Sequence, residues 1–391
     1  MDYLTESLKK HLEWQGKIEV ISRVPVKTKD DLSLAYTPGV AKPCLMIKED
    51  PEMSYALTRR KNTVAIITDG TAVLGLGDIG PEAAMPVMEG KAVLFKELAN
   101  VDAIPLCIRS NEIDEIVNCV KLLAGSFGGI NLEDISAPRC FTIERKLKAA
   151  LDIPVFHDDQ HGTAIVVLAA VMNALKLTGK EKNKITTVIN GAGAAGIATA
   201  RLLKDYGIEN IILCDRQGAI YKSRENLNSE KELIAEVTNP FMRKGSLSEV
   251  IKGTDLFIGV SAPDCVTKSM VESMNKDPIL FPLSNPIPEI MPDLAKDGGA
   301  VIVGTGRSDF PNQINNALAF PGVFKGALAA NATDINEKMK IAAAEAIAGF
   351  VKDNDLKPDY IVPSPLEREV SLHIAEAVKK AAHESGAVRK V

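Results

Sequence analysis

The sequence predicts an α/β protein with two domains, and three observations support this. Its 391 residues suit two domains of ordinary size. Short apolar runs alternate with amphipathic segments, as in folds that join parallel strands through helices. A strand, a glycine-rich turn and a helix follow one another near the middle of the chain. We therefore expect an N-terminal α/β domain over residues 1–160. A Rossmann-type domain with a doubly wound parallel sheet and a C-terminal helical tail should follow over residues 161–391.

The composition is that of an ordinary globular protein, with 46% hydrophobic and 25% charged residues. A net charge of -5 argues against a nucleic-acid partner, whose binding surface would be basic. The first residues lack the apolar region of a signal peptide, and the longest apolar stretch, residues 164–177, is too short to span a bilayer. We expect a cytoplasmic protein without a membrane or nucleic-acid partner.

In the N-terminal half, strands are predicted over residues 62–68, 101–108, 129–132 and 153–156, with helices over 113–125 and 138–151. The run from Gly75 to Gly80 matches the spacing G-x-G-x-x-G. However, Pro81 and Pro86 should break up the start of the next segment, and the acid of the following strand, Asp102, lies at its wrong end. We interpret this run as a tight loop and not as a cofactor cradle.

Two acidic pairs each close a predicted strand. Glu133 and Asp134 follow residues 129–132, and Asp158 and Asp159 follow residues 153–156. Consecutive parallel strands place both pairs at the same edge of the sheet. A single pair could be a helix N-cap, whereas two pairs at equivalent positions predict a site for a hard cation. Oxygen ligands favour Mg²⁺ or Mn²⁺ over zinc, with His157 and His161 as the nearby nitrogen candidates.

The second half contains a complete dinucleotide-binding pattern. A strand over residues 185–190 leads into Gly191-Ala192-Gly193-Ala194-Ala195-Gly196 and a helix over 197–206. Gly191 suits the turn, Gly193 the close approach of pyrophosphate, and Gly196 the packing of helix on strand. Asp215 closes the next strand, where an acid accepts hydrogen bonds from the adenosine ribose and favours NAD. Arg216 could offset repulsion of a 2′-phosphate, so NADP stays open.

Three further residues allow two interpretations each. Tyr36 lies beside the turn at residues 38–39 and is either a core residue or a functional one. Lys91 lies between a glycine and an apolar run. It is either a surface lysine whose charged end reaches solvent or a buried, functional lysine. Asn285 follows a strand predicted over 279–283, one of three later strands with 255–260 and 300–304, and could bind a ligand or merely start a turn.

A nicotinamide site beside a divalent cation suits oxidation of a 2-hydroxy acid, and the cation can also stabilise the enolate left by loss of CO₂. That reaction needs a base for the hydroxyl proton and an acid for the enol carbon, and Lys91 and Tyr36 are candidates. A lysine base must be neutral near pH 7. A pKa lowered by about 3 units corresponds to roughly 4 kcal/mol, which burial and a nearby cation could supply.

Residues from about 20 to about 330 together resemble the malic enzyme family in its short bacterial form. The resemblance is carried by an ordered set of motifs: Ala35-Tyr36-Thr37-Pro38-Gly39-Val40, Ile67-Thr68-Asp69-Gly70, Leu74 to Gly80, Gly90-Lys91, Glu133-Asp134, Phe156 to Thr163, Ser284-Asn285-Pro286 and Asn315-Asn316.

The resemblance implies an N-terminal catalytic domain and a homodimer or larger assembly. It implies NAD(P)-dependent oxidative decarboxylation of L-malate to pyruvate and CO₂, together with decarboxylation of oxaloacetate. It implies Lys91 as the base and Tyr36 as the acid, with Asp158 supporting Lys91. The resemblance also implies that the metal ligands are Glu133, Asp134 and Asp159. It implies that Asn285 and Asn316 contact the substrate.

One departure and two alternatives remain. Long eukaryotic forms carry a substrate-binding arginine where this chain has Thr71-Ala72-Val73, so a partner for the substrate carboxylate should come from elsewhere, such as a neighbouring subunit. A malolactic-type decarboxylase, which keeps its cofactor and releases lactate, would share these motifs. A non-catalytic nucleotide-binding regulator would not need Tyr36, Lys91 and three carboxylates together.

Overall fold

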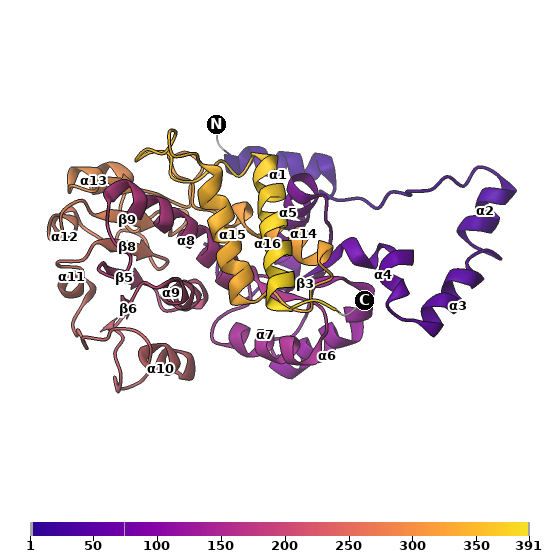
Figure 1. Ribbon diagram of the computed structural model, residues 1–391, viewed down its shortest axis with the longest axis horizontal. Coiled ribbons are helices and arrows are strands. Elements are labelled where there is room, and N and C mark those ends of the chain that lie inside the picture. The colour runs from indigo at the N-terminus through magenta and orange to yellow at the C-terminus, as the bar shows by residue number, and fades with distance from the viewer. Residues whose placement is uncertain (1–2, 74, 390–391) are drawn as a thin grey trace.

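The computed structural model describes residues 3–73 and 75–389, and two largely parallel sheets organise it (Figure 1). The first sheet has the order β2-β1-β3-β4, and all its neighbouring strands run parallel. Its strands are β1 (Thr63–Thr68), β2 (Asp102–Cys107), β3 (Gly129–Leu132) and β4 (Val155–His157). Its connecting helices are α5 (Pro81–Ala99), α6 (Ile113–Leu123) and α7 (Arg139–Ala150). The strands and helices predicted in this half are confirmed.

The second sheet has the order β10-β9-β8-β5-β6-β7. Five of its strands are parallel: β5 (Thr186–Asn190), β6 (Asn210–Asp215), β8 (Leu256–Gly259), β9 (Ile279–Pro282) and β10 (Ile302–Val303). The short antiparallel strand β7 (Gly218–Ala219) was not predicted. The order reverses beside β5, which is where doubly wound sheets bind their ligands. The helices of this half are α9 (Ala194–Tyr206), α10 (Ser229–Ala235), α11 (Leu247–Val250), α12 (Lys268–Glu272) and α13 (Pro292–Asp297).

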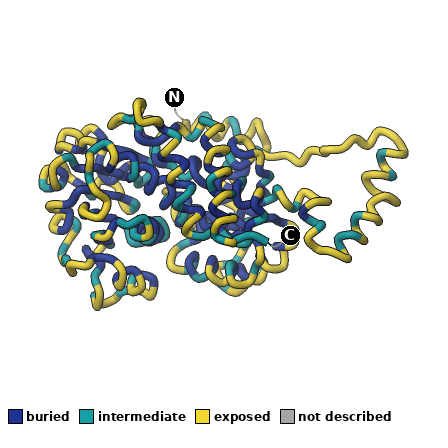
Figure 2. The backbone as a smooth tube through the Cα atoms, in the orientation of Figure 1, coloured by how far each residue is buried: buried dark blue, intermediate teal, exposed yellow. Residues whose placement is uncertain are grey.

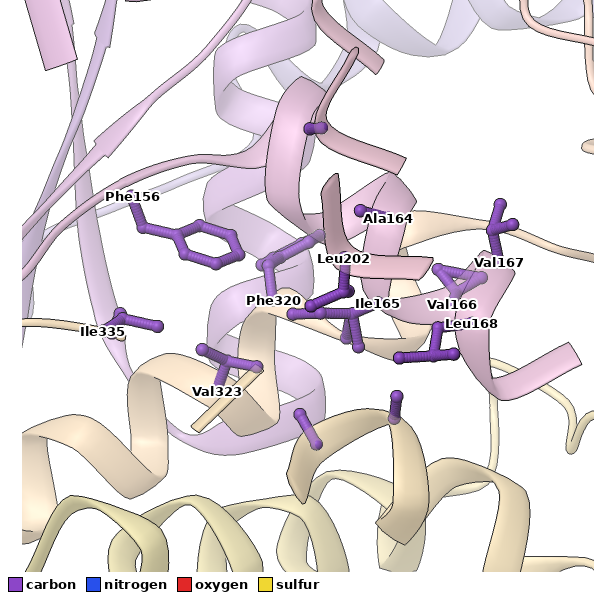
Figure 3. Close-up of a cluster of buried hydrophobic side chains, with 14 of the residues drawn as sticks. Phe156, Ala164, Ile165, Val166, Val167, Leu168, Leu202, Phe320, Val323 and Ile335 are labelled. Carbon is purple, nitrogen blue, oxygen red and sulfur yellow. The ribbon is translucent and has the colours of Figure 1, made fainter. Parts of the chain in front are cut away.

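A long helix, α8 (Asp158–Thr178), joins the two sheets. It begins six residues before the apolar stretch at 164–177, so Asp158 and Asp159 form its first turn. With 21 residues, α8 is long and apolar enough by composition to cross a membrane, but most of its residues are buried inside the protein. Figure 3 shows Ala164 to Leu168 packed near Leu202 and Phe320. This packing indicates a core helix shared by both halves.

The last three helices return the chain to the first sheet. They are α14 (Phe320–Ala329), α15 (Glu337–Phe350) and α16 (Arg368–Ser385). The rings of Phe320 and Phe324 lie 4.7 and 5.4 Å from that of Phe95 in α5. Phe324 also meets Phe156 of β4 at 5.7 Å. Buried aromatic contacts of this kind contribute strongly to a core, so C-terminal residues complete the packing around the N-terminal sheet. The boundary between residues 160 and 161 stays a prediction.

Lys17 is hydrogen-bonded to Glu89 and Pro86 of α5, and residues 18–52, here called the N-terminal arm, leave the body of the molecule after it (Figures 1 and 2). The arm follows α1 (Tyr3–Trp14), contains α2 (Lys29–Ala35) and α3 (Ala41–Glu49), and returns through α4 (Met53–Leu57). No residue of α2 or α3 is buried. Large apolar side chains along the arm face solvent, among them Val20, Ile21, Leu34, Tyr36 and Leu45. This many exposed large apolar side chains on one projecting segment are typical of a protein interface.

Candidate active site

The two acidic pairs meet at one edge of the first sheet, as predicted. β3 and β4 are adjacent and parallel, so the residues that follow them lie side by side. One carboxylate oxygen each from Glu133, Asp134 and Asp159 lies within 4.8 Å of the other two. The backbone amide of Asp134 donates to Asp159 Oδ2 over 2.8 Å, which fixes the first pair against the second. We call these three residues the acid cluster.

Lys91 of α5 points into this edge of the sheet and is 7% exposed. Its Nζ lies 2.9 Å from Glu133 Oε1, donates to Asp158 Oδ2 and sits 3.9 Å from the ring centre of Phe320. Lys91 is therefore a buried, paired lysine and not a snorkelling one. Burial alone would lower its pKa, but Asp158 and Glu133 raise the pKa above its ordinary value. Because these two carboxylates stabilise the ammonium, the lowered pKa expected of a lysine base stays a prediction for the site with a cation bound.

The acid cluster fits a divalent cation. Burial first, and then Asp159 and Glu133, raise the pKa of Asp134 to about 9. Asp134 Oδ2 is buried and has no hydrogen-bond partner among the described residues. A buried carboxylate oxygen without a partner is costly, and oxygen ligands suit Mg²⁺ or Mn²⁺. The cluster contains carboxylates alone, which agrees with the predicted preference for a hard cation.

The two histidines beside the cluster make other contacts. His161 Nε2 lies 2.8 Å from Glu144 Oε1, and Glu144 is buried on α7. His157 is buried in β4, and its Nδ1 is 3.7 Å from Asp159 Oδ2. Neither histidine belongs to the acid cluster. Sequence reasoning did not single out Glu144, although its place on the inner face of an amphipathic helix could have suggested burial.

The two asparagines predicted to contact substrate occupy different surroundings. Asn316 starts a 3₁₀ turn before α14, and its Nδ2 donates to Asp158 Oδ2. It therefore joins the group around Lys91. Asn285 follows β9, is partly buried and donates to the carbonyl oxygen of Leu283 over 3.3 Å. That contact suits either a turn residue or a ligand-binding one.

The glycine-rich run at residues 75–80 is an irregular loop, as predicted, but one reason given for it is wrong. α5 begins at Pro81 and continues through Pro86, so the prolines do not break up the segment. Proline is well suited to the first helical position, where no amide hydrogen bond is required. A Cβ atom built on Gly75 would lie 3.6 Å from the Asn285 carbonyl oxygen. The loop thus brings the first half of the chain against the loop after β9.

The predicted dinucleotide cradle has the expected backbone geometry. Gly191 has φ of 118°, which favours glycine, and α9 starts at Ala194 directly after the turn. A Cβ atom on Gly196 would collide with the carbonyl oxygen of Gly191, so helix and strand pack too closely for a side chain. A Cβ atom on Gly193 would meet nothing within 4 Å. Gly193 thus borders open space at the helix N-terminus, where pyrophosphate binds in this motif.

This difference predicts a clear effect for Gly193→Ala. The added methyl group has room in the protein, so the melting temperature should stay close to that of the wild type. It would occupy the space of the pyrophosphate, and NAD should bind at least about tenfold more weakly, which corresponds to ~1.4 kcal/mol. Gly349→Ala is the control, because a Cβ atom there also meets nothing within 4 Å, at an exposed position of α15. Equal NAD affinity in both variants, by calorimetry, would contradict the assignment.

Asp215 closes β6, as predicted, but it is not a free acid. Its Oδ1 accepts from the Gln217 amide and from Arg224 Nη1, both at 3.0 Å. Its Oδ2 accepts from Arg224 Nη2 and from Lys231 Nζ, the latter at 2.6 Å. Burial would raise its pKa, but the hydrogen bonds from Arg224, Lys231 and the amide lower the pKa to about 2. These partners outweigh its negative charge, so the predicted repulsion of a 2′-phosphate is weaker than expected.

Arg224 and Lys231 were missed because they lie 9 and 16 residues beyond Asp215, outside the fingerprint. The basic residue that the sequence did suggest, Arg216, is exposed.

Tyr36 is the predicted residue that the chain does not bring to the site. It ends α2 at the far end of the N-terminal arm and is 68% exposed (Figure 1). The first sheet, with Lys91 and the acid cluster, lies in the body of the molecule (Figure 1). Within one chain, Tyr36 and Lys91 are therefore far apart.

A dinucleotide cradle on one sheet, with a buried lysine and an acid cluster that fits a cation on the other, is typical of a nicotinamide-dependent oxidoreductase. Comparison with known proteins refines this class. The family model for the malic enzyme N-terminal domain matches residues 15–148, and that for the malic enzyme NAD-binding domain matches residues 160–383. The chain belongs to the malic enzyme family, as the sequence motifs predicted.

Three relatives illustrate the range of the family. The chain is 57% identical to the bifunctional malic/malolactic enzyme of Bacillus subtilis (strain 168), over 100% of this chain and 95% of that protein. It is 49% identical to an NADP-dependent malic enzyme of Rhizobium meliloti (strain 1021), over 96% of this chain and 51% of that protein. The crystal structure of an NAD-dependent malic enzyme from Thermotoga maritima has a TM-score of 0.91 and 47% identity, covering 95% of this chain and 98% of that one.

Proposed function

We propose that this protein is a malic enzyme that converts L-malate to pyruvate and CO₂ while reducing NAD or NADP. The observation that carries the proposal is the buried pairing of Lys91 with Asp158 and Glu133 beside the acid cluster. A purely nucleotide-binding protein has no need to bury this charged group. The same site would decarboxylate oxaloacetate, and we propose a cytoplasmic enzyme.

In the proposed reaction, Lys91 takes the proton of the substrate hydroxyl while the hydride on C2 passes to the nicotinamide. Loss of the C4 carboxylate as CO₂ leaves the enolate of pyruvate, and Tyr36 protonates its C3 atom. Asp158 holds Lys91 in place, and Asn316 holds Asp158. A divalent cation on Glu133, Asp134 and Asp159 would polarise the substrate oxygens and offset the carboxylate charge that now raises the pKa of Lys91. Asn285 would contact the substrate from the second sheet.

We propose that the active enzyme is a homodimer, or a larger assembly of such pairs, in which the arm of one copy reaches the site of another. Tyr36 cannot protonate a substrate held beside Lys91 of its own chain while the arm points away from the body. The exposed apolar side chains of the arm supply the surface that a second copy would cover. We propose that the arm of the neighbouring copy also supplies the residue that binds the substrate carboxylate.

A malolactic reaction is the second candidate, because the Bacillus subtilis relative is named as a bifunctional malic/malolactic enzyme. One assay separates the two. The protein is mixed with L-malate and Mn²⁺, in parallel with NAD and NADP, with and without a chelator, and followed at 340 nm. We expect growth of reduced cofactor that the chelator abolishes, with one pyruvate formed for each cofactor reduced.

Lactate without net reduction would instead favour the malolactic reaction. A protein that binds NAD but forms neither product with any cofactor would contradict the proposed function.

A further inference from the structure

Behind the acid cluster lies a buried polar chain that the proposed reaction does not use. Glu144 of α7 is 6% exposed, and its Oε1 lies 2.8 Å from Nε2 of His161. The same oxygen accepts from the backbone amide of His157 over 3.3 Å. On the other side of the ring, His161 Nδ1 lies 3.2 Å from Nζ of Lys340, a buried lysine of α15. We call Glu144, His161 and Lys340 the anchor chain.

The donors and acceptors of the anchor chain fix the state of the imidazole. A lysine ammonium can only donate, so Nδ1 of His161 accepts from Lys340. An ionised carboxylate can only accept, so Nε2 of His161 carries a proton and donates it to Glu144. The ring is therefore neutral, in a single tautomer and a single orientation. A ring flipped by half a turn would lose both hydrogen bonds.

The segment held in this way carries the carboxylates of the site. Glu144 is hydrogen-bonded to the backbone amide of His157 and to the side chain of His161. Asp158 and Asp159 lie between these two residues in the chain. Asp158 bonds to Lys91, and Asp159 belongs to the acid cluster. Both residues stand in the first turn of α8, where a helix end is free to fray unless other groups tie it down. The anchor chain restrains this first turn through hydrogen bonds that join α8 to α7 and α15.

We propose that Glu144, supported by Lys340 through His161, is a positioning residue that holds Asp159 in the geometry for cation binding. The inference rests on the proposed function, because it takes the acid cluster as the cation site. Groups that orient metal ligands from outside commonly change metal affinity or activity by 10–100-fold when they are removed.

The test is Mn²⁺ binding by calorimetry to the full-length protein, without substrate, for the wild type, Glu144→Gln and Lys340→Met. We expect Mn²⁺ affinity to fall about 10–100-fold in Glu144→Gln and by a smaller factor in Lys340→Met. NAD affinity should not change, because the cradle lies on the other sheet. Glu337→Gln is the matched control: Glu337 also pairs with Lys340, but its side chain is 53% exposed and it does not touch His161.

Enzyme kinetics separate positioning from general damage to the fold. If Glu144 acts by positioning, the Mn²⁺ concentration for half-maximal rate rises in Glu144→Gln, and saturating Mn²⁺ restores most of kcat. Wild-type Mn²⁺ affinity in a folded Glu144→Gln, or a loss of kcat that no Mn²⁺ concentration restores, would overturn the proposal. If Glu144→Gln does not fold, Lys340→Met decides by the same criteria. A wild-type protein that binds no Mn²⁺ would overturn the proposed cation site itself, and this role with it.

Discussion

Replacing Lys91 by alanine should lower kcat by about 10²–10⁴-fold, the usual contribution of a positioned general base. The reason is that Nζ of Lys91 pairs with both Asp158 and Glu133 at the edge of the acid cluster. NAD binding should survive, since the cradle belongs to the other sheet. The measurement is the initial rate of malate-dependent NAD reduction at saturating Mn²⁺, together with calorimetry of NAD binding.

The same change should also cost stability. It removes the cation that pairs with Glu133 and Asp158 in a buried site, and a broken buried ion pair typically costs about 3–5 kcal/mol. Retained NAD binding shows that the assayed protein is folded. Lys96→Ala is the matched control, because Lys96 lies on the same helix but is exposed and pairs with Asp102 at the surface. Turnover of Lys91→Ala at the wild-type rate would refute the assignment of Lys91 as the base.

Tyr36→Phe should also lose about 10²–10⁴-fold in turnover, because it removes the proposed acid while keeping the ring. A second effect is expected when Tyr36→Phe and Lys91→Ala subunits are mixed. If Tyr36 of one copy serves Lys91 of another, a mixed dimer of Tyr36→Phe and Lys91→Ala contains one intact site. An equal mixture of the two inactive variants, after subunit exchange, should recover about a quarter of the wild-type rate, since half of the dimers are mixed and half of their sites are intact.

Each variant incubated alone is the control, and subunit exchange is followed with two different fluorescent labels. Exchange without recovery of activity would contradict a shared site. Full activity of a Tyr36→Phe homodimer would contradict the role of Tyr36 altogether.

Site features that arise from neighbouring strands could be predicted from the sequence. The two acidic pairs close consecutive strands, and parallel pairing of β3 with β4 brings Glu133 and Asp134 beside Asp159. The cradle was equally predictable, because its glycines have local backbone reasons: Gly191 has a positive φ, and Gly196 has no room for a Cβ atom.

Features that depend on distant contacts were not accessible. The pKa of Lys91 is raised by two carboxylates 42 and 67 residues away in the chain. Phe320 covers Lys91 from a helix that sequence order assigned to the other half. The exposure of Tyr36 also has no local signature, because Leu32, Leu34 and Tyr36 look like core residues until the arm is seen to leave the body.

In the proposed reaction, one site oxidises malate and then removes its C4 carboxylate. The most direct measurement uses L-malate labelled with ¹⁴C at C4, in the presence of Mn²⁺ and the better cofactor, and compares released ¹⁴CO₂ with reduced cofactor. We predict equal amounts of both, with both lost on addition of a chelator. Reduced cofactor with the label still in a four-carbon acid would mean a simple dehydrogenase and would contradict oxidative decarboxylation at this site.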